Sequence, residues 1–283
     1  MKVEKIGVIG AGTMGNGIAQ AFASAGYEVV LQDLSQEALA RGLKAIESSL
    51  GRQVKKEIIT EAEAKAVLGR ISPVTEVEAM ADRDLVIEAI LEKLEVKTAL
   101  IQKLDGICRA EAILASNTSS ISLTQIAAAS KHPSRVIGMH FFNPVPMMAL
   151  VEVISALQTA PEVRETILEV TKSIGKEPKA SKDSYGFVVN RVLVPMINEA
   201  INLLHEGVAT AEDIDAMMKL GANHPIGPLA LADLVGLDIC LNVMETLMAG
   251  FNDPKYRPSP LLKQMVHAGW LGRKSGKGFF DYS

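Results

Sequence analysis

The stretch IGVIGAGTMG, residues 6–15, decides the fold of this chain. It begins with a short apolar run typical of a buried strand, and a helical pattern of apolar side chains then continues to Ala25. A second apolar run, EVVLQD at residues 28–33, follows the stop signal at Gly26. Strand, helix and strand within so short a span predict a βαβ unit, which begins a parallel sheet.

The glycines of this stretch have the spacing GxGxxG, which is typical of dinucleotide-binding folds. Gly10 permits a tight turn, Gly12 lets a pyrophosphate approach the backbone, and Gly15 lets the helix pack close to the strand. Thr13 and Met14 fall in the first turn of the helix, whose N-terminus favours a phosphate. The flanking strand and helix argue against a glycine-rich turn without a ligand.

Asp33 ends the second predicted strand, about 20 residues beyond the glycine loop, where an acid typically binds the cofactor's ribose. A carboxylate at this place hydrogen-bonds the ribose hydroxyls of NAD and repels the 2′-phosphate of NADP. Residues 34–36 contain no arginine that would hold such a phosphate. We therefore predict NAD as the cofactor, while basic residues elsewhere leave NADP open.

The strand-and-helix pattern continues to residue 184 and is interrupted once. Residues 36–68, rich in Ala, Glu, Lys and Leu, predict an inserted pair of helices, and Thr60 with Glu63 is typical of a capping box. Later segments are apolar and helical, without β-branched alternation. We predict an α/β fold: a Rossmann-type doubly wound sheet with a helical arm in residues 1–184, then an all-α domain in residues 185–283.

Apolar runs bounded by turns predict the remaining elements. The sheet is expected to resume after Ser72-Pro73. In the second domain we expect a helix over residues 187–206 and another that begins at Thr210 and ends at Gly221. The later strands are expected at residues 85–90, 112–116, 135–139, 150–154 and 177–181.

Composition excludes several classes of protein. The 283 residues are 48% hydrophobic with a net charge of −4, which excludes a disordered chain and argues against a nucleic-acid partner. Two cysteines, Cys108 and Cys240, provide no disulfide framework, so a cytoplasmic location is expected. We see no signal peptide and no uncharged stretch long enough to span a bilayer, and so expect no membrane partner. No His, Cys or Asp cluster has ligand spacing, so no metal is expected.

A dinucleotide domain joined to a helical domain suggests a dehydrogenase. Hydride transfer from an alcohol needs a group that exchanges the hydroxyl proton, and histidine serves this purpose near neutral pH. Of the five histidines, His140 ends a predicted strand at the edge where ligands bind in parallel sheets. The stiff turn FFNPVP, residues 141–146, follows it. From position alone, a packed core histidine is an equally good interpretation.

Several motifs in order along the chain resemble the L-3-hydroxyacyl-CoA dehydrogenase family. The resemblance extends over essentially the whole chain and leaves no room for a fused hydratase domain. It implies the reversible NAD-dependent oxidation of an (S)-3-hydroxyacyl-CoA, with a short acyl chain favoured, to the 3-ketoacyl-CoA. The motifs are SNTSS at 116–120, HFFNP at 140–144, VEV at 151–153, GFVVNR at 186–191 and GRKSGKGFFDY at 272–282.

The resemblance implies a catalytic role for four residues. His140 would be the general acid/base, and Glu152 would orient its ring and stabilise the imidazolium. Asn190 would donate to the 3-keto oxygen, where charge develops during reduction, and Ser119 would bind the same oxygen or help to place the nicotinamide. Without the family pattern, Glu152 would be a solvent-facing strand residue and Ser119 an ordinary turn serine. Asn190 would make a helix-capping or an interdomain hydrogen bond.

The resemblance also implies further contacts with NAD and with coenzyme A. Arg52 and Lys56 of the arm would contact the CoA phosphates, although basic residues on an exposed helix are usually only solvated. Glu92 and Lys97 would likewise be assigned to a solvated helix face on sequence alone. Besides the glycine loop, Asp33 and Ser119, the implied cofactor contacts are Glu92, Lys97, Asn117 and Asn143.

The sequence disfavours two other functions. A hydroxyacid dehydrogenase with a catalytic lysine is disfavoured, because the helix after Gly186 contains no lysine before Lys219. A non-catalytic sensor or structural protein is disfavoured because all four implied catalytic residues are present. Methionines at helical spacing in the second domain are typical of a core or a subunit interface, and the resemblance implies a homodimer through this domain. The sequence leaves the preferred acyl length and the physiological direction open.

Overall fold

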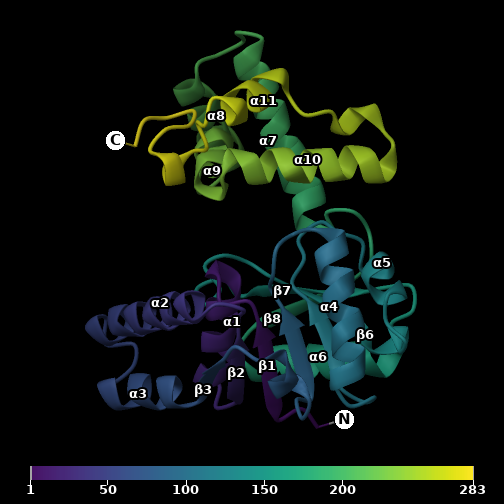
Figure 1. Ribbon diagram of the computed structural model, residues 1–283. Helices are drawn as coiled ribbons and strands as arrows, with labels where there is room; N and C mark the ends of the chain where they lie inside the picture. The colour runs from purple at the N-terminus through teal and green to yellow at the C-terminus, as the bar shows by residue number, and fades with distance from the viewer. Residues whose placement is uncertain (1, 283) are drawn as a thin grey trace. The chain divides into compact units, whose positions relative to one another are not determined.

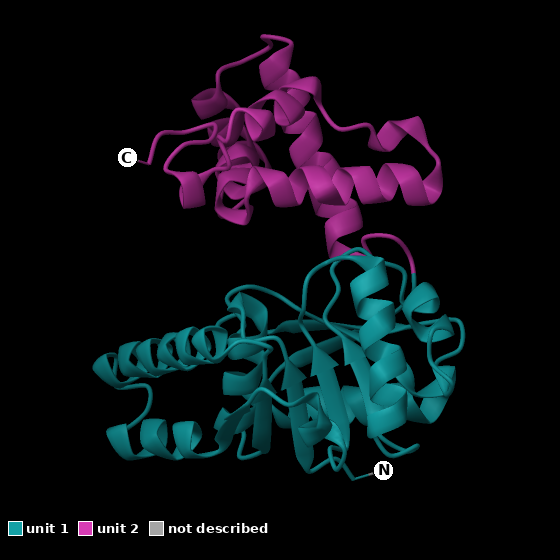
Figure 2. Cartoon of the chain, in the orientation of Figure 1, with its two compact units in different colours: residues 1–183 teal, residues 184–283 magenta. Residues whose placement is uncertain are grey.

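The computed structural model describes residues 2–282, which form two compact units. The first ends at Asp183 and the second begins at Ser184 (Figure 2). The sequence places the boundary one residue later. Each unit has its own hydrophobic core, so each is described by itself.

Unit 1 is built on one eight-stranded sheet with the order β3-β2-β1-β4-β5-β6-β7-β8 (Figure 1). Neighbouring strands are parallel except β6 and β7, which are antiparallel. This order confirms the doubly wound α/β fold expected from the sequence. The strands are β1 (Lys5–Ile9), β2 (Glu28–Gln32), β3 (Ile71–Val74), β4 (Leu85–Glu88), β5 (Ile113–Ser116), β6 (Val136–Phe141), β7 (Leu150–Ser155) and β8 (Glu177–Lys182).

Six α-helices belong to the described part of unit 1. Two of them, α2 and α3, form the predicted arm and contact each other (Figure 1). The capping box at α3 is confirmed: Glu63 N donates to Thr60 Oγ1 over 3.2 Å, and Thr60 N donates to Glu63 Oε2 over 2.7 Å. The helices are α1 (Thr13–Ser24), α2 (Gln36–Lys55), α3 (Glu61–Gly69), α4 (Leu94–Ile107), α5 (Leu123–Ala128) and α6 (Pro161–Ser173), with short 3-10 turns η1 (Val77–Met80) and η2 (Pro133–Arg135).

The first of the later strands differs from the prediction. Ser72 and Pro73 lie inside β3, whereas the sheet was expected to resume after them. β3 is an edge strand that pairs with β2 alone, so the missing N–H of Pro73 leaves the ladder intact. A proline within a run of only four residues gave no strand signal, and the edge position explains why the strand forms nevertheless.

The glycine loop joins β1 to α1 with the close approach that its spacing predicts. Gly10 has φ +98°, a conformation that favours glycine. A Cβ on Gly15 would lie 1.7 Å from the carbonyl oxygen of Gly10, so the helix crosses the end of the strand in direct contact with its backbone. Ile6 and Val8 of β1 are fully buried in the core behind this crossing.

Unit 2 is helical, and its described residues contain no strand beyond isolated bridges. α8 continues past its predicted end at Gly221 and stops at Asn223, whose φ of +56° places it in the left-handed conformation that terminates helices. The elements are α7 (Val189–His205), α8 (Ala211–Ala222), α9 (Pro228–Val235), α10 (Leu237–Phe251) and α11 (Pro260–His267), with η3 (Pro254–Tyr256) and η4 (Arg273–Ser275).

The glycine-rich C-terminal segment folds around the buried carboxylate of Asp233 in α9. The backbone N–H groups of Phe279 and Phe280 donate to it over 3.0 Å each, and the Tyr282 hydroxyl donates over 3.1 Å. A Cβ on Gly278 would lie 1.9 Å from Asp233 Oδ1, so only glycine fits there. The C-terminal motif therefore has a structural reason: it satisfies a buried charge.

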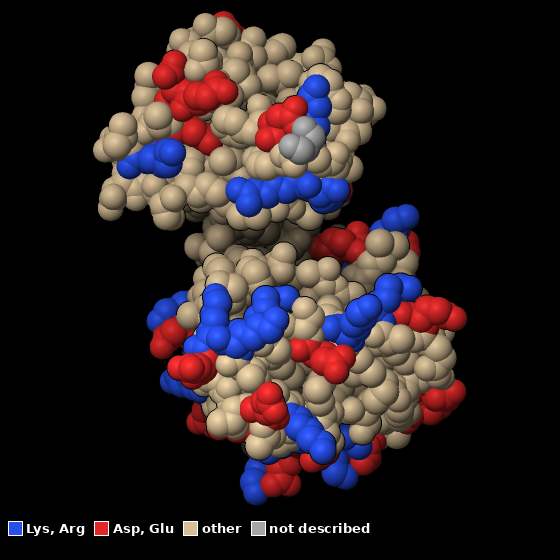
Figure 3. Space-filling model, turned by 90° about the vertical axis from the view of Figure 1, so that its left-hand side faces the viewer, with Lys and Arg blue, Asp and Glu red and all other residues tan. Residues whose placement is uncertain are grey.

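Residues 2–282 include no single helix long and apolar enough to cross a membrane; only the bent pair α9 and α10 passes by length and composition together. Over the same residues, no group of three or more His, Cys, Asp or Glu side chains is placed to hold a metal ion. On the face drawn in Figure 3, basic and acidic side chains are interspersed.

Gly15→Ala should destabilise unit 1 by about 3 kcal/mol or more, because the new methyl group would overlap the Gly10 carbonyl. Gly51→Ala is the matched control, since nothing lies within 4 Å of its Cβ position in α2. That change should stabilise the helix by about 0.5–1 kcal/mol. Urea unfolding measures both, and equal effects at the two positions would contradict the packing described here.

Candidate active site

The parallel strands bring three loops to one edge of the sheet. Glu88, the last residue of β4, pairs in register with Ile9 of β1 and with Ser116 of β5. Ser116 in turn pairs with Gly138 of β6. The glycine loop, the turn after β5 and the end of β6 with His140 therefore lie at neighbouring carboxyl ends, where parallel sheets bind ligands.

His140 and Glu152 face each other across the antiparallel pair β6 and β7. His140 Nδ1 lies 2.7 Å from Glu152 Oε2, and the two side chains are only 7% and 4% exposed. A carboxylate accepts hydrogen bonds only, so Nδ1 carries the proton and donates it. The alternative of a solvent-facing Glu152 is thereby wrong, because the residue is buried and points at the histidine. In the neutral ring, the unprotonated nitrogen is then Nε2.

The end of β6 is tied to the turn after β5. Phe141 N donates to Asn117 Oδ1 over 2.9 Å. The ring of Phe142 packs on the imidazole of His140 with centroids 4.4 Å apart. Asn143, an implied cofactor contact, follows on the surface. Asn117 thus fixes the backbone next to His140, and Phe142 packs against its ring.

Lys176, the residue immediately before β8, supports the loop between β6 and β7. Its ammonium donates to the carbonyl oxygens of Val145 over 2.6 Å and Met148 over 2.8 Å. Burial lowers the pKa of Lys176 from its ordinary value. The loop between His140 and β7 is thus held by a cation that the sequence did not single out.

The SNTSS turn is organised by Glu92. Its Oε1 accepts from the Thr118 hydroxyl over 2.5 Å, from Ser119 N over 2.8 Å and from the Ser119 hydroxyl over 3.2 Å. Lys97 Nζ lies 3.2 Å from Glu92 Oε2 and 2.9 Å from Glu88 Oε2, and its side chain is 1% exposed. The expectation of a solvated helix face at Glu92 and Lys97 is therefore wrong. Their contact with NAD stays a prediction.

The two carboxyl groups beside Lys97 respond differently to burial. Burial raises the pKa of Glu88 above its ordinary value, and the Lys97 ammonium and the Ser116 hydroxyl oppose this rise. Burial acts in the same direction on Glu92, but Lys97, Thr118 and the Ser119 N–H outweigh it, so the pKa of Glu92 is lowered. A lowered pKa favours the ionised form of Glu92, which suits an acceptor for the donors of the turn.

The glycine loop fits a dinucleotide. Gly12 precedes α1 without a side-chain cap, and nothing lies within 4 Å of its Cβ position, so the first turn with Thr13 and Met14 is open to an anion. Asp33 Oδ2 accepts from Ala11 N over 2.8 Å, which places the predicted ribose-binding carboxylate beside this loop.

The implied substrate contacts lie on two separate parts of the chain. Arg52, near the end of α2, is exposed and donates to the Ser48 hydroxyl over 2.9 Å, and Lys56 caps the same helix end. Asn190 is the second residue of α7 in unit 2 and is partly buried. It follows a turn with φ values of +70° at Gly186 and +49° at Phe187.

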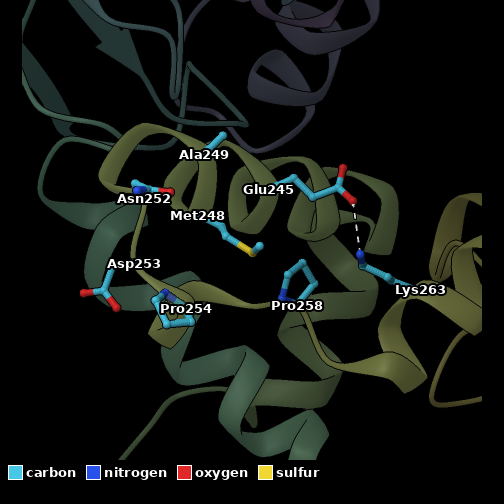
Figure 4. Close-up of a pocket in the computed structure, with 8 residues that line it drawn as sticks. All are labelled: Glu245, Met248, Ala249, Asn252, Asp253, Pro254, Pro258 and Lys263. Carbon is cyan, nitrogen blue, oxygen red and sulfur yellow. Dashed lines mark ion pairs between the residues drawn. The ribbon is translucent and has the colours of Figure 1, made fainter.

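A surface pocket of about 410 Å³ lies in unit 2 (Figure 4). Its lining residues are distant in sequence from Asn190, the predicted site residue of this unit. Glu245 and Lys263 pair across it over 3.7 Å. None of the implied catalytic residues lines it. The remaining lining residues are Met248, Ala249, Asn252, Asp253, Pro254 and Pro258.

Sequence reasoning missed the side chains that support the site. Glu88 is buried and accepts from Ser116 at the start of the SNTSS turn, Phe142 packs on the histidine, and Lys176 supports the next loop. One signal was visible: Glu88 is the single charge in the apolar run LVIEAI, residues 85–90. A charge inside a buried strand must have a partner, which indicates a polar cluster.

Comparisons with known proteins agree with this arrangement. Residues 5–184 match the NAD-binding domain of 3-hydroxyacyl-CoA dehydrogenases, and residues 186–282 match their C-terminal domain. The chain is 54% identical to a probable 3-hydroxybutyryl-CoA dehydrogenase of Deinococcus radiodurans, over 98% of this chain and 100% of that protein. It is 51% identical to a 3-hydroxybutyryl-CoA dehydrogenase of Bradyrhizobium diazoefficiens, over 99% and 96% of the two chains.

A solved structure matches over the full length of both chains. The (S)-3-hydroxybutyryl-CoA dehydrogenase of Ralstonia eutropha is 52% identical, with a TM-score of 0.96 and coverage of 100% of each chain. Both family domains are thus matched in order along one chain. The resemblance seen in the motifs is confirmed: the chain belongs to the 3-hydroxyacyl-CoA dehydrogenase family and carries that family's NAD-binding domain.

Proposed function

We propose that this chain catalyses the reversible oxidation of (S)-3-hydroxybutyryl-CoA, and of other short-chain (S)-3-hydroxyacyl-CoA esters, to the 3-ketoacyl-CoA. Membership of the family supports the reaction type. Relatives more than 50% identical that are named 3-hydroxybutyryl-CoA dehydrogenases support the short acyl chain. The observation that carries the proposal is the buried pair of His140 and Glu152 at the edge of the sheet.

The pair exchanges the proton of the substrate hydroxyl. His140 Nε2 takes this proton during oxidation and returns it during reduction. Glu152 holds the ring in the required orientation and stabilises the imidazolium through Nδ1. NAD, when bound, supplies the acceptor for the hydride that leaves substrate C3.

Ser119 and Asn190 bind the oxygen on substrate C3. The hydroxyl of Ser119 and the amide NH₂ of Asn190 donate to it as negative charge develops during reduction of the ketone. Donors that are fixed before the reaction need no reorganisation when that charge appears. The hydrogen bonds from the Ser119 N–H and hydroxyl to Glu92 support this role, because they fix the serine before substrate arrives.

The proposed contacts with the cofactor and with CoA come from different parts of unit 1. Gly10, Gly12 and the start of α1 hold the pyrophosphate, and Asp33 binds the ribose and disfavours NADP. The remaining cofactor contacts are those implied by the family. Arg52 and Lys56, exposed on the arm, contact the CoA phosphates.

We further propose a homodimer formed through unit 2. Several large apolar side chains of this unit are exposed, which suits a subunit interface. A cytoplasmic location, without nucleic-acid or membrane partners, and a place in fatty acid or butanoate metabolism complete the proposal. The exposed side chains in question are Val192, Leu203, Met217, Leu220, Ile239 and Met248.

Acetoacetyl-CoA should be reduced with NADH and not with NADPH, because Asp33 repels the 2′-phosphate. Free acetoacetate should turn over far more slowly, because it lacks the CoA moiety that the arm binds. Loss of absorbance at the NADH band measures all three reactions. A preference for NADPH would contradict the role of Asp33, and equal rates with free acetoacetate would contradict CoA recognition.

His140→Ala should lower kcat by about 10²–10⁴, because the general acid/base is lost. Glu152→Gln keeps the shape of the side chain but removes its charge, and should lower kcat while the variant still binds NADH. NADH oxidation gives kcat, and nucleotide fluorescence titration gives binding. Near-normal turnover of His140→Ala would show that another group moves the proton.

Arg52→Ala and Lys56→Ala should each raise the KM for acetoacetyl-CoA by up to about fivefold, the scale of an exposed ion pair, with kcat unchanged. Lys65→Ala provides the control, because this exposed lysine lies on α3 of the same arm. Steady-state kinetics at saturating NADH give both constants. An unchanged KM in both single variants and in their combination would exclude these cations from CoA binding.

A further inference from the structure

We infer that Glu88 is a positioning residue for this reaction: beneath the SNTSS turn, it acts through Ser116 and through Lys97 with Glu92 to fix Ser119. Nothing in the motifs of the family resemblance involves Glu88. The inference rests on the role proposed above for Ser119. The inference explains what holds Ser119 in place, and it does not change which substrate atom Ser119 is proposed to bind.

Glu88 is a buried charge with a complete set of partners. It is 1% exposed at the end of the central strand β4. Its carboxylate accepts from Lys97 Nζ over 3.0 and 2.9 Å, from the Ser116 hydroxyl, and from Ile90 N over 3.2 Å. An ionised group in the core is retained only with such partners, so each of these donors is held in place by the carboxylate.

The shorter route to Ser119 runs along the chain. Ser116 donates its hydroxyl proton to Glu88, and this turns the oxygen's lone pairs toward the turn. Thr118 N donates to that oxygen over 3.2 Å. Glu88 thus fixes Ser116 at the end of β5 and, through it, the backbone N–H of Thr118, the residue before Ser119.

The second route crosses from β4 through α4. Lys97 bridges Glu88 and the Oε2 atom of Glu92, while the Oε1 atom of Glu92 accepts from Thr118 and Ser119. Without the charge of Glu88, the ammonium has one anion instead of two and moves toward Glu92. The carboxylate of Glu92 then reorients, and its hydrogen bonds to the turn change. Both routes therefore end at Thr118 and Ser119.

A second buried ion pair in the same unit allows a matched comparison. Arg135 Nη2 lies 2.6 Å from Asp105 Oδ1, with the side chains 5% and 1% exposed. The further donors to Asp105 are the Ser130 hydroxyl and Lys131 N, which belong to neither the turn nor β4. If buried pairs served stability alone, Glu88 and Asp105 would be equivalent for turnover.

The test is a double-mutant cycle on the full-length protein with NADH and acetoacetyl-CoA. Glu88→Gln should lower kcat by about tenfold or more, the scale expected for a misplaced reacting group. In the Ser119→Ala background the same change should have little further effect, because the serine it positions is gone. Asp105→Asn should lower the Tm, leave kcat within about twofold, and combine additively with Ser119→Ala.

Each outcome decides the matter. If Glu88→Gln lowers kcat by the same factor with and without Ser119, or leaves kcat unchanged, Glu88 does not act through the serine and the inference is wrong. If Ser119→Ala alone leaves kcat unchanged, the role proposed for Ser119 fails and the inference fails with it. Should Glu88→Gln not fold, Ser116→Ala removes only one hydroxyl and enters the same cycle with the same expectation.

Discussion

The site depends on one reversal of strand direction. Five parallel strand pairings carry the sheet from β3 to β6, and then β7 runs antiparallel to β6. Directly opposed residues in an antiparallel pair bring their Cβ atoms within about 5 Å of each other. Glu152 therefore lies opposite His140, and its carboxylate reaches the imidazole over 2.7 Å. The parallel strands supply the edge where ligands bind, and the reversal supplies the carboxylate that a histidine at this edge needs.

Carboxylates that accept from two backbone N–H groups recur throughout both units. Each one joins segments distant in sequence, so a loop is fixed without a long hydrophobic element behind it. Glu92 follows this pattern, since it accepts from the N–H groups of Ser119 and Ser120. It is also paired with the buried Lys97, which contacts Glu88 as well. The turn that carries Ser119 is thus held by the same kind of contact that joins distant segments elsewhere in the chain. The other examples are Asp84 with Glu4 and Lys5, Asp183 with Leu123 and Thr124, Asp215 with Leu229 and Ala230, and Asp233 with Phe279 and Phe280.

Local patterns were sufficient to predict the doubly wound sheet, the arm and the first βαβ unit, because glycine spacing, caps and apolar runs act over a few residues. The edge strand with Pro73 was missed, since its stability comes from its place beside β2 and not from its composition. His140 could be selected by its position at a strand end, but Glu152 required the family resemblance, since strand direction is set by tertiary packing. Lys97 was misjudged for the same reason: its burial depends on Glu88, which lies on another element.

The most direct test of this account is the ¹⁵N NMR spectrum of the His140 ring in the wild-type protein, assigned by comparison with a His140→Gln variant. Because Glu152 accepts from Nδ1, the neutral ring should carry its proton on Nδ1 and present Nε2 as the base. The two nitrogens should then show the distinct shifts of a protonated Nδ1 and an unprotonated Nε2. A neutral ring protonated on Nε2 would contradict the account, because that tautomer can neither donate to Glu152 nor take a proton from the substrate at Nε2.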